Sequence, residues 1–249
     1  MKKLITLLAL SIVLFSCSND DATAPQPLVK VIDKIEVQKT NTNGNTLTNR
    51  FDFEYNNNKE ISKISKFVES EFYYSLTYTY QNNIPVSSMY DYPEGGDPVY
   101  QINYGYTNGI YSSYYDTFYD DTTVFSYNAQ FNQFTSSING NRFVLNDSYD
   151  LVSISDSGNE YAFSYDTGKK GCFYNVVNKK WIPSLWYGIS GLRIIEMSTY
   201  PITSLFDDNL GQSIPYTNTY DTDGFVTKSE FTSNNGTLAY EITYTYKNI

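Results

Sequence analysis

The fold is decided by the stretch Leu76-Thr-Tyr78-Thr-Tyr80-Gln-Asn-Asn-Ile84-Pro-Val86. It alternates large apolar residues with small polar ones, breaks at an amide-rich turn, and then starts a second alternating run. Alternation with a period of two puts successive side chains on opposite faces of a β-strand. The stretch therefore predicts two antiparallel strands joined by a tight turn.

Variants of this stretch recur along most of the chain. They include Phe53-Glu-Tyr55-Asn-Asn-Asn, Ile102-Asn-Tyr104-Gly-Tyr106-Thr-Asn-Gly109-Ile110 and Tyr240-Glu-Ile242-Thr-Tyr244-Thr-Tyr246-Lys-Asn. The aromatic residue that ends each first strand stands at positions 55, 80, 106, 127, 165, 220 and 246. One hairpin with its turns takes about 20 residues, so most of these intervals hold a single hairpin.

The predicted fold class is all-β, a meander of repeated antiparallel hairpins that forms a long curved or coiled sheet. Aromatic residues fall on one side of each strand and Thr, Ser or Asn on the other, which indicates one packed face and one face in water. A further turn is expected at residues 206–211. The expected strands span residues 29–39, 48–55, 61–66, 72–80, 84–90, 99–106, 110–115, 124–127, 142–145, 151–154, 161–165 and 194–200.

The composition limits the class of protein. With 249 residues, 41% hydrophobic content and 26 Tyr, the chain can bury the core of one sizeable domain, or of two. Its formal net charge of −10 repels phosphate backbones, so nucleic acid is not an expected partner. The chain has no His, which excludes the catalytic triads and zinc sites that require one. No cofactor is expected.

The first residues resemble the signal peptide of a bacterial lipoprotein. Two lysines are followed by an apolar run that is too short to span a bilayer, as in a secretory signal peptide. The run ends in Leu14-Phe15-Ser16-Cys17, which is similar to the lipobox that precedes an acylated cysteine. The resemblance implies that residues 1–16 are removed and that acyl chains on Cys17 anchor the protein to the membrane. The alternative is an ordinary signal peptide with an incidental cysteine.

Residues 17–28 are the expected acylated cysteine and its flexible tether, with Pro25 and Pro27 marking a linker. Ser18-Asn-Asp-Asp21 resembles the acidic export signal with which lipoproteins of Bacteroidota reach the outer cell surface. The alternative is a solvated tether without a targeting role. Residues 29–249 are expected to form a single β-repeat domain.

The repeats resemble the YD repeats of Rhs-type and wall-associated bacterial proteins. The closest match is Tyr220-Asp221-Thr-Asp223-Gly224-Phe225-Val226, and Tyr165-Asp166-Thr-Gly168 is a shorter version. From residue 29 to 249, the chain is also similar to small outer-membrane lipoproteins of Bacteroidota whose function is unknown. The resemblance implies a long antiparallel sheet, curved or coiled upon itself, and it implies no particular activity.

One segment, residues 171–191, interrupts the repeats. It contains both Trp residues, Trp181 and Trp186, together with Tyr187 and several aliphatic residues. Two interpretations stay open: the segment fills the open face or end of the sheet, or it presents these three rings as a platform for a glycan or a protein partner. Residues 184–189 suit one helical turn or a packed loop. Cys172 is expected to be a buried thiol, because Cys17 is assigned to acylation.

Carboxylates supply the remaining candidate sites. Asp221-Thr-Asp223-Gly224 is similar to the start of a calcium loop, but the twelfth position lacks the required Glu, and a hairpin turn explains the residues. The sequence also contains candidate acid pairs for glycoside hydrolysis, which needs two carboxyl groups facing each other across the scissile bond. Their turn-like surroundings favour solvated turns instead, so no catalytic residue and no metal site is expected. The candidate pairs are Asp120-Asp121, Asp207-Asp208 and Glu94 with Asp97.

The sequence thus predicts a non-catalytic binding or scaffold lipoprotein of the bacterial cell envelope, anchored to the outer membrane and exposed at the cell surface. The main alternative is a role on the periplasmic side in envelope assembly, with chaperone-like binding of other envelope proteins. A glycoside hydrolase is the remote alternative.

Overall fold

The computed structural model describes residues 28–93, 99–138, 140–156, 158–177, 197–233 and 236–249. These residues form seventeen strands of one sheet, and no helix occurs among them. The first eight strands are β1 (Lys30–Asn41), β2 (Thr46–Tyr55), β3 (Ile61–Val68), β4 (Glu71–Gln81), β5 (Ile84–Asp91), β6 (Tyr100–Thr107), β7 (Ile110–Asp116) and β8 (Asp121–Asn128). The others are β9 (Gln133–Ser136), β10 (Arg142–Leu145), β11 (Leu151–Asp156), β12 (Asn159–Tyr165), β13 (Ile202–Asp207), β14 (Gln212–Pro215), β15 (Thr217–Tyr220), β16 (Val226–Ser233) and β17 (Leu238–Asn248).

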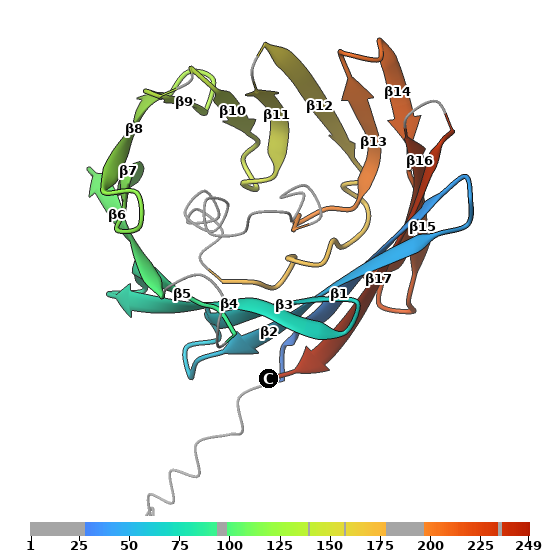
Figure 1. Cartoon of the computed structure of the whole chain (residues 1–249), viewed down its shortest axis with the longest axis horizontal. Helices are drawn as coiled ribbons and strands as arrows, with labels where there is room; N and C mark the ends of the chain where they lie inside the picture. The colour runs from blue at the N-terminus through green and yellow to red at the C-terminus, as the bar shows by residue number, and fades with distance from the viewer. Residues whose placement is uncertain (1–27, 94–98, 139, 157, 178–196, 234–235) are drawn as a thin grey trace, which may run out of the picture.

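The sheet closes into a nearly complete ring (Figure 1). Except for β14 and β15, strands that follow one another in the chain pair in antiparallel fashion, and the last strand, β17, pairs with the first, β1, over the whole length of β1. Strands β14 and β15 are two halves of one bent strand. Between them, the backbone N–H of Tyr216 donates to the carbonyl of Thr203 in β13 at 2.9 Å. The antiparallel meander expected from the sequence is confirmed, and its curvature brings the two ends of the sheet together.

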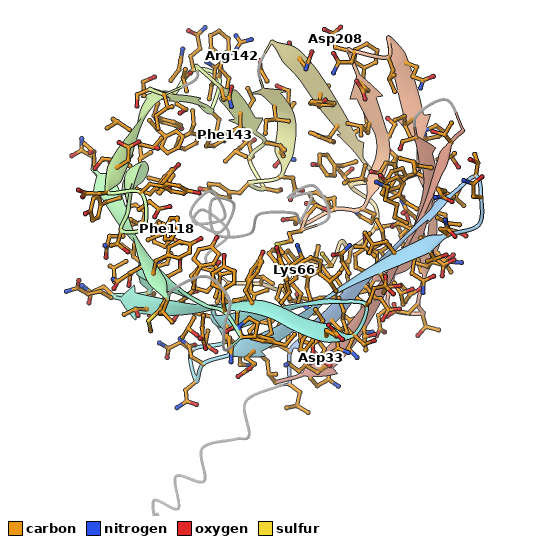
Figure 2. All side chains as sticks on the ribbon, viewed as in Figure 1. Asp33, Lys66, Phe118, Arg142, Phe143 and Asp208 are labelled. Atoms are coloured by element: carbon orange, nitrogen blue, oxygen red, sulfur yellow. The ribbon has the colours of Figure 1, made fainter. Side chains whose placement is uncertain are left out.

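The pleat of the strands separates an apolar interior from a largely polar outer wall, on which Met89, Val124, Val152 and Phe206 are exposed apolar exceptions. In β10 the side chain of Phe143 points into the ring, while that of its neighbour Arg142 points away from it (Figure 2). The same alternation buries Phe51 and Phe53 of β2, and the intervening Asp52 is only half-buried. The ring is therefore filled by its own side chains. The most deeply buried of these include Ile32, Ile35, Ile64, Tyr74, Leu76, Tyr90, Tyr111 and Ile242.

The tyrosine at the end of the first strand of a hairpin binds a part of the sheet that comes earlier in the chain. Five of these hydroxyl groups donate to backbone carbonyl oxygens 14 to 23 residues earlier in the chain. The bonds are Tyr55 to Ile32 (2.8 Å), Tyr80 to Ile61 (2.7 Å), Tyr106 to Pro85 (2.7 Å), Tyr165 to Leu151 (2.7 Å) and Tyr246 to Val226 (2.6 Å). Burial raises the pKa of Tyr55, Tyr80, Tyr165 and Tyr246, which keeps these hydroxyl groups protonated as donors. The repeat thus uses tyrosine as both an apolar filler and a hydrogen-bond donor.

An Asn or Asp directly after the end of a strand shapes the turn that follows it. The side-chain oxygen Oδ1 of Asn56, Asn146 and Asp221 accepts from the backbone N–H groups two and four residues later, at 2.8 to 3.0 Å. This arrangement is an Asx-type turn, in which the side chain replaces a backbone acceptor. The residue three positions after the Asn or Asp has a positive φ, and it is Gly224 (81°) in the third turn. The Tyr-Asp-x-x-Gly pattern therefore encodes a turn that the chain uses repeatedly.

The connection between β12 and β13 enters the ring, and we call its described parts, residues 166–177 and 197–201, the plug (Figure 1). Its two arms pair with each other, because the N–H of Gly171 donates to the carbonyl of Thr199 at 2.7 Å and that of Phe173 to Ser198 at 2.9 Å. Phe173 is fully buried and meets Phe53 edge to face, with ring centroids 6.0 Å apart. The structural interpretation of the interruption is supported for these residues.

The strand expected at residues 194–200 is wrong in its described part. Residues 197–200 form no strand, and β13 starts at Ile202. Met197, Ser198 and Thr199 are buried in the plug, where backbone groups of Ser198 and Thr199 bind the opposite arm. The apolar residues that imitate a strand pattern are thus explained by burial inside the ring.

Candidate functional site

Several residues singled out in the sequence lie outside the described part of the structure. These are Cys17, the platform residues Trp181, Trp186 and Tyr187, and the acidic residues Glu94 and Asp97. Cys172, on the first arm of the plug, is buried as expected.

The two described acid pairs lie in hairpin turns at one end of the ring. Asp120 accepts a hydrogen bond from the hydroxyl of Tyr115 at 2.7 Å, and Asp121 accepts one from the N–H of Thr122 at 2.7 Å. Asp208 lies in the exposed turn after β13 and points away from the ring (Figure 2). The carboxylates of Asp120 and Asp121 thus bind groups close to them in the chain, and neither acid pair lines the pocket described below.

The Asp221 and Asp223 carboxylates bind an ammonium group of the protein itself. Lys30 Nζ donates to Asp221 Oδ2 at 2.5 Å and to Asp223 Oδ2 at 3.1 Å, and it lies 5.0 and 5.6 Å from the ring centroids of Phe225 and Tyr246. Burial alone would raise the pKa of Asp221, but the hydrogen bonds from Lys30 and from backbone N–H groups lower it. The hydrogen bond to Asp221 raises the pKa of Lys30. This arrangement of two carboxylates and two rings fixes the start of β1.

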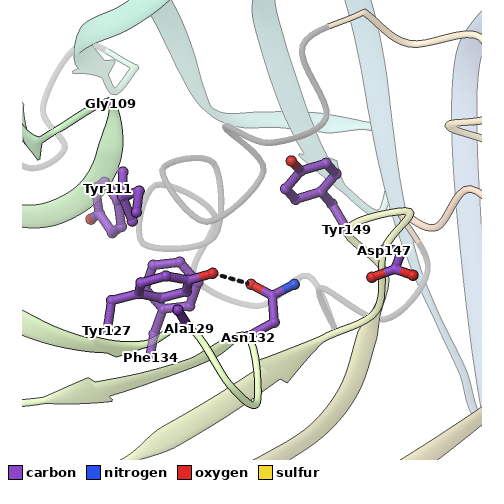
Figure 3. Close-up of a pocket in the computed structure, with 9 residues that line it drawn as sticks. Gly109, Tyr111, Tyr127, Ala129, Asn132, Phe134, Asp147 and Tyr149 are labelled. Carbon is purple, nitrogen blue, oxygen red and sulfur yellow. Dashed lines mark hydrogen bonds between the residues drawn. The ribbon is translucent and has the colours of Figure 1, made fainter.

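A pocket opens at the end of the ring where β1 begins. It has a volume of about 310 Å³. It is built from three turns that are neighbours at this end of the ring, those between β6 and β7, between β8 and β9, and between β10 and β11 (Figure 3). A cavity of this size is at the lower end of the range of small-molecule sites. Its lining residues are Gly109, Ile110, Tyr111, Tyr127, Ala129, Asn132, Phe134, Asp147 and Tyr149.

Asn132 holds two of these turns together. Its Nδ2 donates to the carbonyls of Leu145 and Asn146, at 3.2 and 3.3 Å, and its Oδ1 accepts from the hydroxyl of Tyr127 at 3.1 Å. The Tyr127 ring packs on Phe134, with centroids 4.8 Å apart. One aromatic wall of the pocket is therefore fixed by a hydrogen bond at its edge and by a second ring behind it (Figure 3).

Tyr149 and Asp147 come from the third turn, across the pocket. Tyr149 has a φ of 66° and occupies the position that Gly224 occupies in the Asp221 turn. A positive φ is unfavourable for a large side chain and costs about 1–2 kcal/mol, whereas glycine adopts it freely. The Asp147 carboxylate is exposed at the pocket edge. The sequence analysis missed this site, and its one local signal was an aromatic residue at a glycine position.

The described residues contain no group of three or more His, Cys, Asp or Glu side chains arranged to hold a metal ion. No helix among them has the length and apolar character needed to cross a membrane.

No protein-family model and no curated protein sequence matches the chain. Solved structures with a similar course of the backbone include a porin-like protein from Bacteroides uniformis, with a TM-score of 0.45, 16% sequence identity, and coverage of 87% of this chain and 96% of that chain. Another is a porin-like protein from Bacteroides vulgatus, with a TM-score of 0.40, 12% identity, and coverage of 88% of this chain and 99% of that chain.

Proposed function

We propose that the protein is a non-catalytic binding or scaffold lipoprotein of the bacterial cell envelope, anchored by acyl chains on Cys17 while the ring lies outside the bilayer. The observation that carries the proposal is the charged outer wall. Lys228 of β16 bridges Glu230 and, on β17, Glu241 at 3.0 and 2.9 Å, and Arg50 pairs with Asp52 on β2 at 3.1 Å. A sheet that faces lipid presents an apolar band instead, because charges are destabilising there. The ion-paired residues of this wall therefore favour contact with water over contact with lipid.

The position of the first strand agrees with a lipid anchor. Val29 and Ile249 exchange backbone hydrogen bonds of 2.9 and 3.0 Å, so the chain enters and leaves the ring at one end. Eleven residues separate Cys17 from Val29, a length that reaches at most about 40 Å when fully extended. The anchor would hold the ring by the end that carries the pocket and the Asp221 turn.

The outer face of the outer membrane is the proposed location, on the strength of Ser18–Asp21 and of the resemblance to YD-repeat-like lipoproteins. The periplasmic side, with a role in envelope assembly, is the alternative. The buried core supports a binding or scaffold role over transport through the ring, because apolar side chains of the strands and of the plug pack together inside it.

Metabolic labelling with an alkyne analogue of palmitate tests the anchor. Wild type and Cys172→Ser, the control for the other cysteine, are expected to be labelled, whereas Cys17→Ser is expected to lose the label. Equal labelling of Cys17→Ser would contradict the proposal. On intact cells, protease digestion of a C-terminally tagged protein indicates the cell surface, and protection until lysis indicates the periplasmic side.

A further inference from the structure

Asn132 and Tyr127 present oxygen lone pairs, not N–H or O–H groups, to the pocket between the three turns. The amide of Asn132 uses both of its N–H groups on the carbonyls of Leu145 and Asn146, and the hydroxyl of Tyr127 donates its proton to Asn132. The oxygen atoms of these two side chains keep lone pairs that can face a ligand. The Asp147 carboxylate adds a negative charge. This part of the lining therefore suits a positively charged group.

The charge of the pocket points in the same direction. None of the nine described lining residues is Lys or Arg, while Asp147 is among them. The chain as a whole has a formal net charge of −10, so the surrounding field attracts cations and repels anions. Ligands whose only charged groups are phosphate or carboxylate are therefore unfavourable here, and a cationic group is favoured.

The rings in the pocket specify what kind of cation. Tyr127 and Phe134 form one wall and Tyr149 lies across from them (Figure 3). The faces of aromatic rings carry partial negative charge and attract organic ammonium groups. A small inorganic ion would instead require several oxygen ligands converging on one point.

The protein already contains an example of this recognition at an equivalent turn. The Asp221 turn and the Asn146 turn share the same hydrogen-bond pattern, with bonds to the second and fourth residue. At the Asp221 turn, carboxylates and the faces of Phe225 and Tyr246 hold the ammonium group of Lys30. The Asn146 turn likewise supplies a carboxylate, that of Asp147, and a ring, that of Tyr149, to the pocket.

Tyr149 places a large ring at a turn position where glycine is the unstrained residue, with a φ of 66°. Lys59 also has a positive φ, of 62°, at the equivalent position of the Asn56 turn, so the backbone conformation belongs to the turn type. What distinguishes Tyr149 is that its ring lines the pocket. The alternative role of Tyr149 is packing, because it lies partly buried against the core, and the test below separates the two roles.

We propose that this pocket binds the ammonium group of a small organic amine, held between the rings of Tyr127 and Tyr149 and neutralised by Asp147. The ligand is a free amine or the headgroup of a zwitterionic lipid, which share this chemistry. The inference names a ligand class for the binding role proposed above. It is tested with purified protein, so a failure here leaves the acylation of Cys17 unaffected, and the reverse also holds.

Isothermal titration calorimetry of the full chain in a non-ionic detergent tests the proposal, with choline as the probe. Its uncharged isostere, 3,3-dimethylbutan-1-ol, keeps the shape and replaces nitrogen by carbon. Choline is expected to bind saturably and at least about tenfold more tightly than the isostere, because only the cation gains from the rings and the carboxylate. Phosphocholine separates the two sources: tighter binding than choline indicates a lipid headgroup, and weaker binding indicates a free amine.

Variants assign the binding to the pocket. Asp147→Asn and Tyr149→Gly are each expected to weaken choline binding by about fivefold or more, while Asp208→Asn, an exposed acid in the turn after β13, is expected to leave it unchanged. Tyr149→Gly restores the default turn residue, so the variant is expected to fold. If it does not, Asp147→Asn decides the question alone, because its side chain is exposed. Equal affinity for choline and the isostere, no saturation by choline up to about 10 mM, or an unchanged affinity in Asp147→Asn would overturn the proposal.

Discussion

Replacement of Phe173 by alanine is expected to lower the free energy of unfolding by about 3–5 kcal/mol. Phe173 is fully buried on the first arm of the plug and packs edge to face on Phe53 of β2. Its removal leaves a cavity between the plug and the wall, and the ladder of strands around the ring restricts collapse into that space. Urea denaturation of wild type and Phe173→Ala, followed by circular dichroism, measures the difference.

Val177→Ala is the matched control for this prediction. Val177 belongs to the same arm of the plug but is 39% exposed, so its truncation is expected to change the stability by no more than about 0.5–1 kcal/mol. A loss of stability in Phe173→Ala as small as that in Val177→Ala would show that the plug does not contribute to the core.

The second large effect is expected at Asp150, which fastens the plug to the turn between β10 and β11. Its carboxylate is buried and accepts from the backbone N–H of Thr199 at 2.5 Å and of Tyr200 at 3.2 Å. Asp150→Ala leaves these two donors without their acceptor, at a cost of about 1–3 kcal/mol each, so a loss of about 2–6 kcal/mol is expected. Thermal and urea unfolding measure it.

Asp147→Ala controls for the loss of a carboxylate from the same turn. Asp147 is exposed, and its removal is expected to alter the free energy of unfolding by less than about 0.5 kcal/mol. Hydrogen exchange adds a local test: the amide of Thr199 is expected to exchange faster in Asp150→Ala than in wild type. Unchanged stability together with unchanged protection of Thr199 would contradict the role of Asp150.

The hairpins were predictable because their determinants are local. In the stretch that opens the sequence analysis, alternation forms β4 and β5, and the two amides of the turn, Asn82 and Asn83, adopt positive φ values of 52° and 60°. The Tyr-Asp-x-x-Gly match is likewise local, since Asp221 bonds to the next few N–H groups. The pattern within one repeat therefore contains the information for one hairpin.

Closure of the ring was not predictable in the same way. It depends on pairing between β1 and β17, which lie at opposite ends of the described chain. The sequence of β1 does not specify which strand pairs with it, because a half-buried strand pattern suits any neighbour of the correct register. Part of the plug was wrongly predicted to be a strand for a related reason. Burial inside the ring gives residues 197–199 the apolar character of a strand without a strand ladder.

The candidate site was missed because three turns that are separate in the sequence assemble it. Considered alone, Tyr127 looks like an ordinary aromatic residue at the end of a strand, and Asn132 and Asp147 look like ordinary turn residues. Their common position at one end of the ring follows from the closed meander, in which every second turn lies at the same end. The site can therefore be recognised only after the order and curvature of the strands are known.

The central claim is that a folded ring with a polar outer wall is held at the membrane by lipid alone. The most direct measurement inserts the recognition sequence of a specific protease between Ala24 and Pro25, and cleaves the protein in isolated membranes. We predict that the ring then appears in the supernatant without detergent, with the circular dichroism and melting temperature of the uncleaved protein. A cleaved ring that stays in the membrane pellet would contradict the account.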